Sequence, residues 1–118
     1  MSFEHVLKEV VERVDGAVSA MVIGTDGILV EEYAVEKLLN LDDLGAESSA
    51  MIRDINLAAQ NLAIGVAKEF SLISDKCGII MHQINPEYYL ALVITPDGNY
   101  GKGRFILRTS IPRITGEF

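Results

Sequence analysis

The residues with the clearest potential for chemistry form a glycine-rich stretch at 97–103, which reads Asp-Gly-Asn-Tyr-Gly-Lys-Gly. It follows an apolar run and precedes a basic segment, so it joins a predicted strand to a predicted helix. In that position, backbone N–H groups and a helix N-terminus can bind phosphate, with the lysine as a counter-charge. The stretch is therefore a candidate nucleotide site.

The spacing of this stretch does not fit either of two common phosphate-binding patterns. A P-loop has a glycine five residues before its Gly-Lys pair and a Ser or Thr after it, but these positions hold Pro96 and Gly103. A dinucleotide-binding loop needs a small residue where Ile106 stands, and a preceding βαβ unit. We therefore interpret the stretch as a turn into a helix. A small phosphate- or nucleotide-binding enzyme using Gly98 to Lys102 stays open as a further hypothesis.

The single cysteine and the histidines are the other candidates for catalysis or metal binding. Cys77 and His82 lie five residues apart in one predicted strand, and this odd separation places their side chains on opposite faces of the sheet. The chain has no second cysteine and no His-x-x-x-His, so we expect no zinc site. Acid–base catalysis requires two carboxylates that converge on one cleft. The neighbouring acids Glu31-Glu32 and Asp42-Asp43 do not indicate such a convergence. We predict no catalytic residue, no metal and no cofactor.

Length, cysteine content and charge limit the class of protein. With 118 residues, the chain is predicted to form one domain over residues 1–118. The lone cysteine and the absence of a signal-like or membrane-spanning apolar run lead us to expect a cytoplasmic protein with no membrane insertion. The net charge of −7 divides into −10 over residues 1–99 and +3 over 100–118. A mostly acidic surface argues against nucleic acid as a partner.

The four basic residues of the last segment form a separate positive group. We expect them to be a solvated helix face, or to lie against acidic neighbours within the fold or on a partner. They are Lys102, Arg104, Arg108 and Arg113.

The first part of the chain predicts a helix and a β-hairpin. Apolar residues from 3 to 14 recur at the spacing of one helix face. Residues 17–24 and 28–33 are rich in β-forming side chains, and the Asp26-Gly27 pair between them is typical of a tight hairpin turn. Residues 35–43 are predicted to be a polar connection.

A long helix is predicted next, from a cap at Asp42 or Asp43 to about Phe70. Steps of about 100° per residue define its core face. That face is predicted to hold Met51, Ile52, Ile55, Ala58, Ala59, Leu62, Ala63, Val66 and Phe70.

A second, narrower apolar ridge lies well away from that core face. It consists of Ala46, Leu57 and Ile64. The helix also contains many small residues, including Gly45 and Gly65, although glycine costs about 1 kcal/mol in a helix interior. Small residues let another backbone approach closely, and leaving a large apolar side chain exposed forgoes about 1.5–3 kcal/mol. We therefore predict that a partner helix packs on the ridge.

Three strands and a helix complete the predicted fold. The strands are expected at about 70–75, 77–84 and 88–95, and the helix at 99–115, with Pro112 bending or ending it. The segments 17–24 and 88–95 are apolar on both alternating faces, which is typical of central strands. The order α-β-β-α-β-β-β-α predicts an α+β fold, in which a five-stranded mixed or antiparallel sheet carries helices on both faces.

This arrangement resembles the Roadblock / dynein light-chain family, and within it the prokaryotic MglB-like members, with layers similar to those of profilin and longin domains. The likeness covers nearly the whole chain. The residues that carry it are Val14-Asp15-Gly16-Ala17, the hairpin at 21–27, the small-residue long helix, and the segment 98–108.

The resemblance implies a homodimer in which the long helices of two protomers pack together. The two sheets would join edge to edge through the strand near 70–75. The implied interface residues are Leu57, Ile64, Ser71 and Ile73.

The resemblance also implies a function, the binding and regulation of a small Ras-like GTPase, in some members by accelerating GTP hydrolysis. Members of this kind act by orienting the GTPase's own catalytic groups, and an arginine supplied in trans, here Arg53, is the other route. The polar partner contacts would be Arg53, Gln60, Asn61 and Lys68. The alternative is a non-catalytic dimeric scaffold of the dynein light-chain type, which binds partners without changing a reaction rate.

Overall fold

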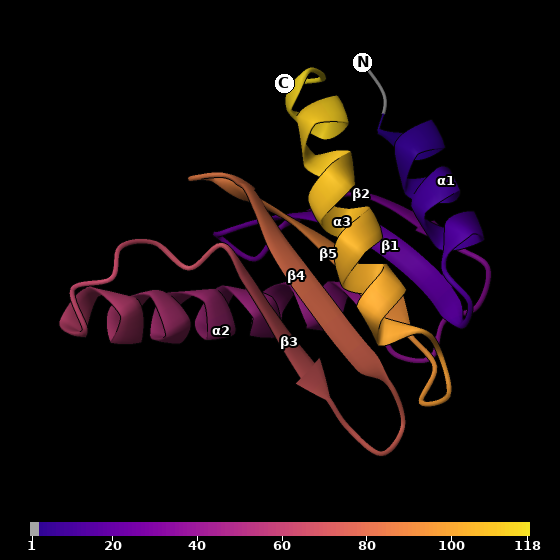
Figure 1. Cartoon of the computed structure of the whole chain (residues 1–118), viewed down its shortest axis with the longest axis horizontal. Helices are drawn as coiled ribbons and strands as arrows, with labels where there is room; N and C mark the ends of the chain where they lie inside the picture. The colour runs from indigo at the N-terminus through magenta and orange to yellow at the C-terminus, as the bar shows by residue number, and fades with distance from the viewer. Residues whose placement is uncertain (1–2) are drawn as a thin grey trace.

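The computed structural model describes residues 3–118, which form three helices and five strands in the predicted order (Figure 1). All five strands belong to one antiparallel sheet with the order β2-β1-β5-β4-β3. The predicted α+β class is therefore confirmed. The elements are α1 (Glu4–Arg13), β1 (Ala17–Gly24), β2 (Leu29–Ala34), α2 (Leu41–Asn61), β3 (Glu69–Ile73), β4 (Gly78–Asn85), β5 (Tyr88–Ile94) and α3 (Tyr100–Thr115).

Helices cover both faces of the sheet and create two separate cores. The helices α1 and α3 lie side by side on one face, over side chains such as Val22 and Leu92. The helix α2 crosses the other face, where Met21 and Val93 are buried. The strands β1 and β5 contribute to both cores and are buried along nearly their whole length. Their prediction as central strands is confirmed, because alternate side chains of each strand enter opposite cores.

The glycine-rich stretch is the turn where β5 leads into α3, as predicted. Its backbone lies against the turn between α1 and β1, because the Asn99 N–H donates to the Asp15 carbonyl at 2.9 Å. A Cβ atom on Gly98 would lie 2.9 Å from the Asp15 carbonyl oxygen and 3.2 Å from Gly16 Cα, both in the turn between α1 and β1. The glycine at this position thus permits a close approach between two segments of the same chain.

The N-terminus of α3 already has a capping group. The Asn99 side-chain oxygen accepts a hydrogen bond from the Lys102 N–H at 3.0 Å. One of the N–H groups that would have faced a phosphate is therefore bound within the chain. Pro112 lies inside α3 and does not end it, since the helix continues to Thr115.

The helix α2 is shorter than predicted and ends at Asn61 instead of near Phe70. The capping residue is Asn40 and not Asp42 or Asp43; its side-chain oxygen accepts a hydrogen bond from the Asp43 N–H at 2.9 Å. Beyond the helix, Ala63 has φ +57° and Gly65 has φ +93°. These left-handed conformations turn the chain back toward the sheet and cannot continue a right-handed helix.

The core face of α2 is consequently different from the predicted one. Ile52 and Ala59 are buried as expected, but Ala58 is exposed, and Met51 and Ile55 are only half-buried. The predicted core residues beyond the helix are exposed or half-buried: Leu62, Ala63, Val66 and Phe70. Burial begins earlier in the helix instead, at Leu41, Leu44, Gly45 and Ser48.

One of the four basic residues of the last segment has an acidic partner. Arg113 Nη2 donates to Glu9 Oε2 at 2.8 Å, which joins α3 to α1. This hydrogen bond and the nearby guanidinium charge lower the pKa of the Glu9 carboxyl and raise the pKa of Arg113. Within residues 3–118, the other three basic side chains form no ion pair and are exposed: Lys102, Arg104 and Arg108.

We expect the Arg113→Gln variant to raise the pKa of the Glu9 carboxyl toward that of an ordinary glutamate. Because the folded-state pKa is the lower one, the pair stabilises the fold above the ordinary glutamate pKa, and this contribution is lost as pH falls through the lowered value. The pair is exposed, so the effect on stability is small. Carboxyl-carbon NMR titration of both proteins measures the shift. Arg104→Gln is the control, and equal Glu9 midpoints in wild type and Arg113→Gln would contradict the assignment.

Candidate functional site

Large apolar side chains are exposed along the end of α2, the connection that follows it and the strand β3. Each is at least 50 % exposed, although burying such a side chain contributes about 1.5–3 kcal/mol. An exposed apolar group of this kind is typical of a protein-contact surface. We call it the α2/β3 surface: Leu57 on α2, Leu62, Ile64 and Val66 in the connection 62–68, and Leu72 and Ile73 on β3. In Figure 1, the connection runs from the end of α2 to the start of β3, and β3 then forms the free edge of the sheet.

The strand β3 forms a free edge of the sheet. Hydrogen bonds from Gln83 N–H to the Lys68 carbonyl and from Ser74 N–H to the Cys77 carbonyl close its two ends against β4. In this register, Phe70 and Leu72 direct their backbone groups to β4. The backbone groups of the alternate residues Glu69, Ser71 and Ile73 therefore point away from the sheet. Such an edge can pair with a strand of another chain.

The structure places the four predicted dimer-interface residues in three segments. Leu57 lies on the exposed side of α2, and Ser71 and Ile73 lie on the edge strand. Ile64 was predicted on a helical ridge, but it lies in the connection 62–68, where it is 72 % exposed. The predicted ridge is wrong beyond Leu57, because the helix that would carry it has ended.

The predicted partner contacts are also divided. Arg53 and Asn61 lie four residues either side of Leu57 and share its exposed stripe of α2. Gln60 follows Arg53 by seven residues, which places it on nearly the same side of the helix, and it also lines a pocket. Lys68, predicted to be on the helix, is in the connection just before β3.

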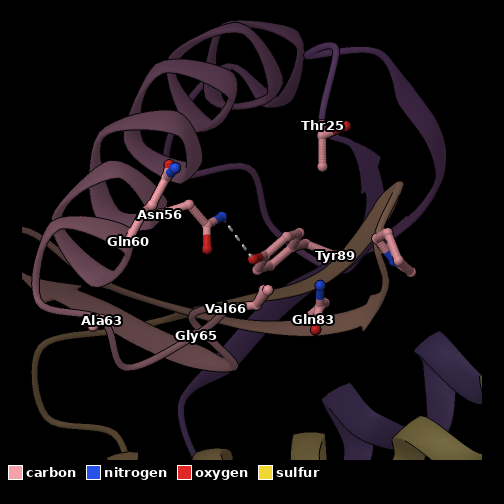
Figure 2. A pocket seen from close by; sticks show the side chains of 9 residues that line it. Thr25, Asn56, Gln60, Ala63, Gly65, Val66, Gln83 and Tyr89 are labelled. Carbon is pink, nitrogen blue, oxygen red and sulfur yellow. Dashed lines mark hydrogen bonds between the residues drawn. The ribbon is translucent and has the colours of Figure 1, made fainter.

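The pocket is a cavity of about 660 Å³ between the end of α2, the connection 62–68 and the turn that joins β4 to β5 (Figure 2). Sequence reasoning did not identify it, because its side chains come from distant segments. They are Thr25, Asn56, Gln60, Ala63, Gly65, Val66, Gln83, Pro86 and Tyr89.

A smaller groove of about 380 Å³ separates the first half of α2 from the edge of the sheet. Its floor is apolar and includes Leu72, which also belongs to the α2/β3 surface. Asp43 and Glu47 bring two carboxylates to its lining. The α2/β3 surface thus continues along the helix into a groove bordered by negative charge.

The chemistry of the described residues gives no metal or membrane signal. Within residues 3–118, no group of three or more His, Cys, Asp or Glu side chains could hold a metal ion. Cys77 packs against the core below α2, whereas His82 lies between Ile80 and Ile84 on the face of the opposite core. The two side chains therefore lie on opposite faces of the sheet, as predicted. No helix in this part of the chain combines the length and apolar character needed to cross a membrane.

No protein-family model and no curated protein matches the chain. Solved structures do match it. MglC from Myxococcus xanthus is 35% identical over 100% of both chains, with a TM-score of 0.73. A Roadblock/LC7 domain from Streptomyces avermitilis superposes with a TM-score of 0.88 at 13% identity, over 99% of this chain and 98% of that one.

The gliding protein MglB from Thermus thermophilus is 21% identical, with a TM-score of 0.85 over 98% of this chain and 89% of that one. The similarity to structures at 13% and 21% identity shows only that the fold is shared. The 35% identity to MglC over the full length of both chains shows the family. The resemblance inferred from the sequence is confirmed, and the chain belongs to the Roadblock/LC7 family, within its MglB- and MglC-like group.

Proposed function

We propose that the protein is a dimeric regulator of a small Ras-like GTPase, which it binds through its α2 helices without an active site of its own. The observation that carries this proposal is the α2/β3 surface. Its apolar side chains lie beside a strand edge with unpaired backbone groups, and together they suit a self-complementary contact between two copies.

In the proposed dimer, the β3 strands of two protomers pair antiparallel and make one continuous sheet. This pairing satisfies the outward backbone groups of Ser71 and Ile73. It also brings the two α2 ends and the two connections together, so that Leu57 and Ile64 become buried. The contact removes exposed apolar side chains of the α2/β3 surface from water.

The exposed stripe of α2 is the proposed contact for the GTPase. Arg53 is the only basic residue of α2 and, within residues 3–118, forms no ion pair. A guanidinium in this state can stabilise the negative charge that develops on the transferred phosphoryl group. Gln60, Asn61 and Lys68 remain proposed polar contacts around it.

The second candidate function is a non-catalytic dimeric scaffold. The composition of α2 favours it, because the helix carries four acidic residues and a single cation. The groove beside α2 is likewise apolar with two carboxylates. Such a surface suits stable binding of a partner protein more than the stabilisation of a phosphoryl group.

Titration into a Ras-like GTPase encoded beside this protein tests both candidates. A regulator should bind in calorimetry and change the single-turnover GTP hydrolysis or nucleotide-exchange rate, whereas a scaffold should bind without changing either. If Arg53 acts in trans, Arg53→Ala should lower stimulated hydrolysis by at least about tenfold and preserve binding. Arg104→Ala on α3 is the matched control. Absence of binding to such a GTPase would contradict the proposed regulator.

A further inference from the structure

We propose that the 660 Å³ cavity at the end of α2 binds a small, uncharged compound that contains an amide group. The ligand is either a free cyclic amide of the pyrimidine-base type or the open-chain amide of a short peptide. This inference does not rest on the proposed GTPase partner, since binding requires no second protein. Two residues of the lining, Gln60 and Val66, also belong to the proposed contacts with the GTPase and with the second protomer.

The size and position of the cavity suit a small molecule. Pockets that bind small ligands are typically about 300–1,000 Å³ and combine apolar walls with a few polar groups. Here Val66 and Pro86 provide apolar wall, and Thr25, Gln60 and Gln83 provide polar groups. Figure 2 shows the space below α2, with Asn56 directed from the helix toward Tyr89 of the sheet.

Hydrogen bonds hold the connection 62–68 in place along one side of the cavity. Asn56 Oδ1 accepts from the Ala67 N–H at 2.9 Å, and the Tyr89 hydroxyl donates to the Ala67 carbonyl at 3.0 Å. Asn56 Nδ2 in turn donates to the Tyr89 hydroxyl at 3.4 Å. Both backbone polar groups of Ala67 are thus fixed by side chains from two other elements.

The connection reaches this position through an unusual backbone conformation. Ala63 adopts φ +57°, which a non-glycine residue rarely does, and it is followed by Gly65 with φ +93°. A Cβ atom built on Gly65 would have no atom within 4 Å. The connection 62–68 therefore borders the cavity without filling it. The hydrogen bonds that link Asn56, Ala67 and Tyr89 hold the connection in this position.

The polar groups of the lining define the ligand's chemistry. Within residues 3–118, no charged side chain lines the cavity, so an ionic ligand would lose hydration without gaining a counter-charge. In the same part of the chain, the Thr25 hydroxyl and the side-chain amides of Gln60 and Gln83 make no hydrogen bond to another protein group; Gln60 is exposed, and Thr25 and Gln83 are half-buried. Gln60 and Gln83 are the only two glutamines of the chain, and each offers one acceptor and two donors. A neutral group with a donor next to an acceptor, which is an amide, complements them.

NMR titration of the ¹⁵N-labelled protein tests the proposal. The probes are two neutral amides, uracil and N-acetylglycinamide, each paired with an anionic analogue, orotate and N-acetylglycine. We expect at least one neutral probe to shift the Gln60 and Gln83 side-chain NH₂ signals saturably, and its analogue to bind about tenfold more weakly. The neutral probe that binds identifies the source of the amide.

Variants locate the binding. Gln83→Leu and Thr25→Val each remove polar groups at similar volume and should weaken the neutral probe about fivefold. Arg104→Leu, on α3 and outside the lining, is the control and should bind as wild type. Thermal unfolding checks that each variant folds, and Thr25→Val remains informative if Gln83→Leu does not. No saturable shift with either neutral probe, equal binding of the anions, or unchanged affinity in the folded variants would overturn the proposal.

Discussion

Replacing Gly16 with alanine is expected to lower the free energy of unfolding by about 2–4 kcal/mol, from left-handed backbone strain together with overpacking. Gly16 has φ +86°, and a Cβ atom there would lie 2.5 Å from Gly98 Cα and 2.7 Å from Thr95 Oγ1. Gly98 is held in place, because its N–H donates to the Thr95 carbonyl and the N–H of the next residue donates to the Asp15 carbonyl, both at 2.9 Å. The added methyl group must therefore separate the turn after α1 from the turn before α3.

The separation would also weaken the main-chain bond between these turns, in which the Thr95 N–H donates to the Gly16 carbonyl at 2.8 Å. Urea unfolding followed by circular dichroism measures the change, at one fixed protein concentration because subunit association adds to apparent stability. The matched control is Gly101→Ala in the first turn of α3, where a new Cβ would meet only Asn99 Oδ1, at 3.8 Å. Helix propensity predicts a gain of up to about 1 kcal/mol there. A Gly16→Ala protein as stable as wild type would refute the account of this turn.

The sequence predicted the sheet well because its signals are local and agree with one another. The Asp26-Gly27 pair fixes a hairpin, and two strands that are apolar on both faces must be central in a sheet with helices on each side. It failed at the end of α2, where apolar residues continue at helical spacing beyond Asn61 while the chain has already turned at Ala63. Nothing in the alanine side chain signals a positive φ.

The site was harder to predict than the fold because it depends on contacts between distant segments. Gly45 was interpreted as a small residue that lets a partner helix approach. The backbone that approaches it belongs to the same chain, because a Cβ atom built on Gly45 would lie 2.8 Å from the Gly27 carbonyl oxygen. The cavity likewise depends on Asn56 and Tyr89 meeting at Ala67. The exposure of Leu57 was predictable, because Leu57 falls outside the apolar face that the helix turns toward the core.

The double variant Leu57→Glu with Ile64→Glu is expected to convert the proposed dimer to monomers. Each protomer would bring two carboxylates into a contact that is apolar in the wild type, and burying unpaired charges costs several kcal/mol each. The dissociation constant should therefore rise by at least about a thousandfold. Sedimentation velocity over a concentration series measures it. Phe105→Glu is the matched control, because Phe105 is 48 % exposed but lies on α3, across the sheet from α2.

A second variant tests the strand edge separately from the helix. The N–H of Ser71 points away from β4, so Ser71→Pro removes a hydrogen bond between protomers and leaves the β3–β4 ladder intact. If α2 and β3 belong to one interface, this variant should also dissociate, while the Phe105→Glu control remains dimeric. A dimer that survives both the helix and the strand variants would place the contact elsewhere. If only the helix variant dissociates, the β3 strands of the two protomers do not pair in the dimer. The proposed continuous sheet would then be wrong, and the β3 edge would be free to pair with a strand of a partner protein.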